Sequence, residues 1–120
     1  MKVRLSKEFR FEASHRLMHL PPDHPCYRLH GHSYKIEIEV YGPVNEQTGF
    51  LIDYADVKQI VDPIIDQLDH RHLNDIEGLA LPSSEHIAHW LWQKIAPKLP
   101  IISRVSVFET ASTRCDYFGE

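Results

Sequence analysis

Three histidines in this sequence, His15, His30 and His32, are spaced so that one metal ion could bind between them. In the run 9–15, apolar residues alternate with polar ones, and strand geometry puts His15 on the apolar face. The run 30–40 alternates in the same way, with His30 and His32 on its apolar face. If these strands pair antiparallel, the three imidazoles meet at one end of a sheet. Three neutral imidazoles with an open fourth position are typical of catalytic zinc. The alternative interpretation is three unrelated polar residues at strand ends.

Cys26 lies four residues before His30, in a segment that must fold back towards the histidines. A free cysteine is most often a small buried hydrophobe. Near a divalent cation, however, its thiol would suit the role of general base or nucleophile. A fourth metal ligand is the remaining interpretation. Cys115 has no comparable neighbours and is predicted to be structural.

Asp69 and His70 are adjacent in the sequence. A carboxylate that orients an imidazole is a recurring device for proton transfer, although an Asp-His dipeptide also occurs by chance. The remaining histidines show no convergence. The following are interpreted as loop or helix-surface residues: His19, His24, His86 and His89.

Glu109 shares a predicted strand face with Val105 and Val107, so a carboxylate stands in line with core residues. A buried carboxylate needs partners, and a ligand with two N–H donors would satisfy both oxygens. An ion pair with an arginine is the alternative. Ser83 and Ser84 are predicted to cap a helix, with ligand binding as a second role.

The elements that would position these residues follow from alternation, capping and proline placement. A long irregular segment between paired strands is more often functional than structural, and residues 17–29 form such a segment. Pro63 is expected to kink or restart the first helix. The predicted elements are strands over 2–15 and 30–41, a helix capped by Asp53 with apolar residues through Leu68, a helix from Ser83 or Ser84 to about Ile95, and strands over 101–110 and 114–118.

This order predicts an α+β fold, in which a four-stranded antiparallel sheet carries two helices on one face (ββααββ). At 120 residues the chain is predicted to be a single domain over 1–120. The outer edges of such a sheet remain exposed. Exposed edges favour a homo-oligomer whose sheets join edge to edge.

The composition narrows the classes of partner. Apolar residues at 42% and charged residues at 25% are ordinary for a globular protein, and the formal net charge of −4 gives no basic footprint for nucleic acid. No segment has the apolar length of a signal peptide or a membrane span, so we expect a cytoplasmic protein without a membrane partner. In a reducing compartment the two cysteines are expected to be free thiols.

The assembled motifs resemble the 6-pyruvoyl-tetrahydropterin synthase and 6-carboxytetrahydropterin synthase family. The resemblance covers nearly the whole chain. It is carried by the residues at 11–17 (FEASHRL), 26–32 (CYRLHGH), 68–70 (LDH), 82–85 (PSSE), 107–110 (VFET) and 117–120 (YFGE).

This resemblance implies the tunnelling fold, in which trimers close their sheets into a barrel and two trimers stack into a hexamer. It also implies a role for each candidate residue. These roles are Zn²⁺ ligands at His15, His30 and His32, a general base at Cys26, a proton relay at Asp69 and His70, and a pterin anchor at Glu109, with Ser83 and Ser84 beside the substrate.

Three residues separate Cys26 from His30, a spacing that resembles the carboxy-forming branch of the family. The implied reaction converts 7,8-dihydroneopterin triphosphate to 6-carboxy-5,6,7,8-tetrahydropterin, acetaldehyde and triphosphate, on the route to queuosine. Lys7, Arg16 and Arg28 are candidates for the triphosphate. Two alternatives stay open, a pyruvoyl-forming synthase and a non-catalytic metal- or pterin-binding protein.

Overall fold

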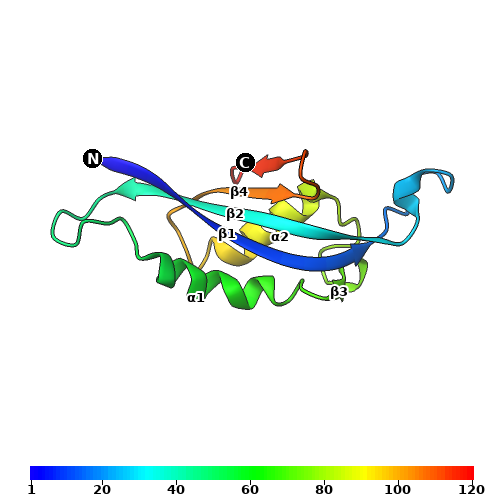
Figure 1. The fold of residues 1–120 in the computed structure, drawn as a ribbon, viewed down its shortest axis with the longest axis horizontal. Coiled ribbons are helices and arrows are strands. Elements are labelled where there is room, and N and C mark those ends of the chain that lie inside the picture. The colour runs from blue at the N-terminus through cyan, green and yellow to red at the C-terminus, as the bar shows by residue number, and fades with distance from the viewer.

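Two long paired strands, β1 (Lys2–His15) and β2 (His30–Pro43), run the length of the molecule (Figure 1). The computed structural model describes residues 1–120 and measures 58 × 23 × 23 Å. The strands pair antiparallel in one continuous register, from Lys2 opposite Pro43 to His15 opposite His30. This pairing confirms the predicted strands, although β2 continues two residues beyond the predicted end at residue 41.

The sheet has five strands in the order β3-β1-β2-β4-β5, which corrects the predicted four-stranded antiparallel sheet. Strand β4 (Ile102–Phe108) pairs antiparallel with β2, and β5 (Cys115–Tyr117) pairs antiparallel with β4. The additional strand, β3 (Arg71–His72), pairs parallel with β1 and makes the sheet mixed. A two-residue strand is too short to show alternation, so no pattern in the sequence could predict it.

Two helices, α1 (Tyr54–Ile65) and α2 (Ser84–Ile95), have the caps that the sequence predicts. Asp53 Oδ1 accepts a hydrogen bond from the first turn of α1, and Ser83 Oγ does the same for α2. Helix α1 continues through Pro63 without a restart and ends two residues later, at Ile65. Neither helix has the length and apolarity that a membrane span requires.

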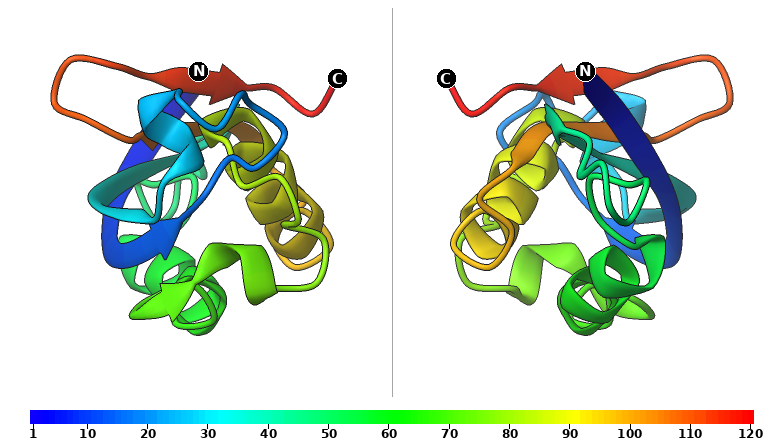
Figure 2. Two further views of the ribbon diagram at one scale, coloured as in Figure 1. Left: turned by 90° about the vertical axis from the view of Figure 1, so that its right-hand side faces the viewer. Right: turned by 90° about the vertical axis from the view of Figure 1, so that its left-hand side faces the viewer.

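Both helices lie on the same side of the sheet (Figure 2) and cover its apolar face. The core therefore lies between this face and the helices, and it ends at the fully buried His15. The opposite face is charged. There Arg104 on β4 lies 3.3 Å from Glu39 and 3.6 Å from Glu37. The sheet thus has a dry, helix-covered face and an open, charged face, and the candidate residues are divided between them.

The short 3₁₀ turn η1 (Pro25–Tyr27) interrupts the segment between β1 and β2, and a second such turn, η2 (Leu73–Asp75), follows β3. Both lie at the same end of the molecule as His15 and His30, because that is where β1 ends and β2 begins. The irregular segments therefore gather around the predicted metal site.

Candidate functional site

The three predicted metal ligands converge on the helix-covered face of the sheet. The β1–β2 register places His15 opposite His30, and His32 opposite Ala13. The ligand atoms of the three histidines all lie within 4.8 Å of one another. The Nε2 atoms of His15 and His30 are 2.9 Å apart. Two nitrogens bound at about 2.0–2.1 Å to a tetrahedral zinc ion would lie about 3.3 Å apart, so the group fits with a small outward movement.

Backbone carbonyls hold two of these rings by their other nitrogen. His15 Nδ1 lies 2.8 Å from the carbonyl oxygen of Pro82, and His30 Nδ1 lies 2.7 Å from that of Arg28. Because a carbonyl can only accept, each Nδ1 carries the proton and each Nε2 keeps a lone pair for a metal. His32 Nε2 is buried and has no hydrogen-bond partner. A metal ion would satisfy this orphaned atom.

Burial also prepares the imidazoles for metal binding. Desolvation lowers the pKa of His15 below its ordinary value, and the neighbouring imidazoles lower it further against the opposing effects of Pro82 and Glu109. Desolvation likewise lowers the pKa of His32, although Glu109 opposes this shift. Both rings are therefore neutral near pH 7, which is the form that binds a metal.

Glu109 joins the three histidines to a pocket. It follows the last residue of β4, and its Oε1 lies 3.4 Å from His32 Nε2. Its carboxylate is half-buried rather than fully buried, and its ion-pair distance is to this histidine and not to an arginine. The pocket has a volume of about 550 Å³. Besides Glu109, its wall contains Leu17, His19, Leu20, Leu81, Ser83, Ser84, Glu85 and His86.

Ser83 and Ser84 line this pocket, but their hydroxyls already have protein partners. Ser83 Oγ accepts from the amide of His86, and Ser84 Oγ donates to Glu85 Oε1 at 2.8 Å. His19 and His86 also line the pocket and were interpreted from the sequence as loop and helix-surface residues. The position of His86 in the first turn of α2, beside the capping serine, is the signal that could have placed it here.

Cys26 lies on the turn η1, half-buried and outside the cluster of metal-ligand atoms. Arg16, a candidate for binding triphosphate, instead holds this turn. Its Nε donates to the carbonyl of Tyr27 at 3.2 Å, and its guanidinium lies 5.3 Å from the centre of the Tyr27 ring. The structure therefore supplies a packing role for Arg16.

Asp69 and His70 form the predicted pair, with Oδ1 and Nδ1 3.0 Å apart. The amide of Glu12 donates to Asp69 Oδ1 at 2.9 Å and is the main reason that the pKa of Asp69 is lowered, with a further contribution from His70. His70 has a left-handed backbone with φ of 58°, and its N–H donates to the carbonyl of Glu12. Such a conformation is uncommon outside glycine and is maintained here by the edge of β1.

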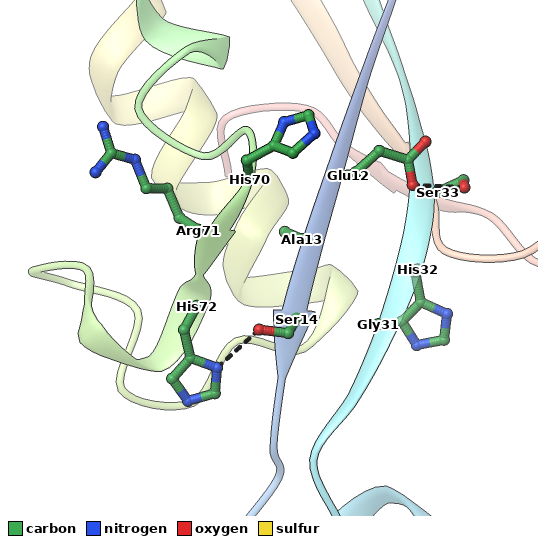
Figure 3. A pocket seen from close by; sticks show the side chains of 9 residues that line it. All are labelled: Glu12, Ala13, Ser14, Gly31, His32, Ser33, His70, Arg71 and His72. Atoms are coloured by element: carbon green, nitrogen blue, oxygen red, sulfur yellow. Dashed lines mark hydrogen bonds between the residues drawn. The ribbon is translucent and has the colours of Figure 1, made fainter.

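Neither residue of this pair belongs to the histidine cluster. His70 lines a hollow of about 490 Å³ together with Glu12 and Ser14 of β1 and with His32 of β2 (Figure 3). Its side chain is 79% exposed. Next to it, Ser14 Oγ and His72 Nδ1 are hydrogen-bonded at 3.0 Å. The structure thus brings Glu109 to the histidine cluster, and it places the Asp69–His70 pair at the edge of the sheet beside β1.

Comparisons with known proteins identify the family to which this chain is similar. Residues 4–120 match the family model described as 6-pyruvoyl tetrahydropterin synthase. A 6-carboxy-5,6,7,8-tetrahydropterin synthase from Synechocystis is 38% identical, with 94% of this chain and 91% of that protein covered. A dihydroneopterin monophosphate aldolase from Pyrococcus furiosus is 32% identical, with 91% of each chain covered. The 6-pyruvoyl tetrahydropterin synthase structure from Caenorhabditis elegans superposes with a TM-score of 0.92 at 25% identity and covers 100% of this chain and 97% of that one.

The five-stranded α+β fold, the histidine cluster and these matches together define the class of protein. The chain belongs to the 6-pyruvoyl tetrahydropterin synthase family, a family of pterin-processing lyases.

Proposed function

We propose that this protein is a zinc-dependent carbon–carbon lyase that converts 7,8-dihydroneopterin triphosphate and water to 6-carboxy-5,6,7,8-tetrahydropterin, acetaldehyde and triphosphate in queuosine biosynthesis. The observation that carries the proposal is the cluster of His15, His30 and His32 with Glu109 3.4 Å from His32 at the wall of a pocket. The name of the Synechocystis relative supports the carboxy-forming reaction.

His15, His30 and His32 would hold the zinc ion through nitrogen atoms whose lone pairs are free. When bound there, zinc supplies Lewis acidity that lowers the cost of anionic states at substrate oxygens. Glu109 anchors the aminopyrimidine edge of the pterin through two parallel hydrogen bonds. Because Glu109 also lies beside His32, this anchor sets the distance between the pterin ring and the ligand cluster.

Cys26 removes a proton from the substrate side chain as the general base. Asp69 Oδ1 lies 3.0 Å from His70 Nδ1 and orients the imidazole, so that it can transfer protons on the other side of the substrate. A general acid or base of this kind contributes on the order of a hundred- to ten-thousand-fold in rate.

The placement of the relay supports a homo-oligomer. Asp69 and His70 lie at the sheet edge, outside the cluster of three histidines, and the His70 side chain is 79% exposed. A relay in this position acts on a substrate that another copy of the chain holds. The proposed assembly is the hexamer of two trimers, in which each sheet edge meets a neighbouring sheet.

The test is an anaerobic incubation of the zinc-loaded protein with 7,8-dihydroneopterin triphosphate, followed by identification of the pterin product and of acetaldehyde. A 6-carboxy product with acetaldehyde supports the proposal. A 6-pyruvoyl product moves the protein to the other branch. An aldolase-type product would align it with the Pyrococcus relative, and binding without turnover would indicate a pterin-binding protein.

A further inference from the structure

The turn that carries Cys26 has no hydrophobic core of its own. None of the residues of η1 is fully buried, and the thiol is half-buried. Packing therefore does little to set its position, which depends on hydrogen bonds. Arg16 holds the carbonyl of Tyr27 in the same turn, and two further bonds hold the backbone of Cys26 itself. Its carbonyl accepts from the amide of Leu17 at 2.9 Å, and its amide donates to His24 Nδ1 at 3.0 Å.

These two bonds hold the cysteine from opposite sides. Leu17 lies two residues after the metal ligand His15, so the carbonyl side of Cys26 is tied to the metal centre. The turn continues to Arg28, whose carbonyl contacts His30. On the amide side the hydrogen bond comes from the His24 side chain.

We infer that His24 is a positioning residue for Cys26, an inference that rests on the proposed role of Cys26 as general base. A backbone N–H only donates, so His24 Nδ1 is the acceptor and the ring carries its proton on Nε2. His24 has an extended backbone and occupies the N-cap of η1, a position where Asn, Asp, Ser and Thr commonly supply the acceptor. The competing interpretation is that His24 caps an ordinary surface turn and has no effect on the reaction.

The conservative variant His24→Asn separates these interpretations, since an asparagine side chain at an N-cap also offers an oxygen acceptor. His24→Ala removes the acceptor. The exposed neighbour Asp23 provides the matched control Asp23→Ala, which alters the same segment and leaves the cap in place. For each variant, kcat and KM on 7,8-dihydroneopterin triphosphate and bound zinc per chain are measured.

His24→Ala is expected to lower kcat on the order of 10- to 100-fold with KM and zinc content unchanged, because a small displacement of a catalytic group costs rate without weakening substrate binding. His24→Asn should restore most of kcat, and Asp23→Ala should match the unmodified protein. The inference is overturned if His24→Ala keeps full kcat, if His24→Asn is as slow as His24→Ala, or if KM rises instead, since His24 would then contact the substrate.

Hydrogen exchange across residues 17–29 gives a readout that does not depend on activity. Protection of this segment should be lost in His24→Ala and retained in His24→Asn. If Cys26→Ala keeps full turnover, Cys26 is not the general base, and the positioning role falls with that assignment. If the His24 variants keep full kcat while Cys26→Ala is inactive, the proposed function stands and the inference alone is wrong.

Discussion

The two faces of the sheet hold their functional residues in different ways. On the helix-covered face, His15 is fully buried, and the long antiparallel register brings its ring to within 2.9 Å of His30. On the open face, Asp69 and His70 occupy a turn at the sheet edge, with His70 79% exposed and bonded to the main chain of Glu12. One chain therefore brings the three histidines together completely, whereas the Asp69–His70 pair is left exposed to solvent at the sheet edge.

The largest loss of activity is expected from removing a histidine on the helix-covered face. His30→Ala should abolish both zinc binding and turnover, because it removes one of three ligands, and outer-shell changes alone commonly cost about 10–100-fold in metal affinity. Metal content after competition with a chelator provides the measurement. His89→Ala, which alters an exposed histidine on α2, is the control and should retain zinc. Full activity of His30→Ala with zinc bound would show that the cluster is not the site.

Cys26→Ala tests the proposed general base, which lies on the turn η1. We expect turnover to fall on the order of a hundred- to ten-thousand-fold, while zinc content and folding stay nearly unchanged, because the thiol lies outside the cluster of ligand atoms. Zinc per chain and single-turnover rates measured together provide the test. Loss of zinc in this variant would make Cys26 a ligand and remove it from the role of base.

His70→Ala should remove the proposed proton relay and leave the histidine cluster intact. Turnover should fall on the order of a hundredfold, with zinc binding unchanged. If the relay serves a neighbouring chain, inactive His70→Ala and inactive His30→Ala proteins should regain activity when they are unfolded together and reassembled. In such mixed oligomers some sites combine intact metal ligands with an intact relay. No recovery on mixing would place both parts of the site in one chain.

The difference between the faces also explains what the sequence could predict. Period-two alternation runs through residues 9–15 and 30–40, so the shared face of His15, His30 and His32 could be predicted, and the structure confirms it. The side of the sheet that the Asp69–His70 pair occupies depends on β3, whose two residues show no periodicity. Its place is determined by main-chain hydrogen bonds to Glu12, which no side-chain pattern records.

The same limit applies to the irregular segments around the site. The sequence could place Cys26 near the histidines, because a connection between paired strands must return to the same end of the sheet. It could not predict that His24 bonds the amide of Cys26, or that Arg16 bonds the carbonyl of Tyr27. Such contacts join side chains to the backbone of a turn, and their partners follow no repeat.

Titrating groups on the two faces of the sheet should lose their contributions to folding stability in different pH ranges. Burial lowers the pKa of His15 and His32. Below about pH 6.5 these two histidines are therefore protonated in the unfolded chain while they are still neutral in the folded chain. The stability of metal-free protein should therefore fall from about pH 6.5 down to the lowered values of the folded state. On the open face, hydrogen bonds from Ser103 and Arg104 outweigh burial and lower the pKa of Glu39, whose contribution is lost only at more acidic pH.

Urea midpoints of metal-free protein at about pH 7.5 and 5.5, at one protein concentration, measure the histidine contribution. The midpoint should be lower at the acidic pH, and His15→Phe should reduce this dependence. An unchanged midpoint between the two pH values would mean that the buried imidazoles accept protons as readily as those of the unfolded chain.

Ser14→Ala should have the smallest effect on stability and activity. It tests whether a change on the open face leaves the neighbouring His15 on the helix-covered face undisturbed. Ser14 precedes His15, but its side chain points to the open face and bonds His72 Nδ1 at 3.0 Å, tying β3 to β1. Loss of one part-buried hydrogen bond should cost about 0.5–1.5 kcal/mol of unfolding free energy. Zinc affinity should not change, because the neighbouring His15 points to the helix-covered face and is held by Pro82.

A double-mutant cycle with His72→Ala measures whether this cost belongs to the Ser14–His72 pair. In Ser14→Ala, turnover should fall by a larger factor than zinc affinity. The reason is that β3 directly follows His70, so a loosened β3 displaces the His70 side chain. If Ser14→Ala lost zinc while keeping turnover per bound metal, the strand edge would be coupled to the ligands through β1, and the two faces would act as one unit rather than as separate halves of a shared site.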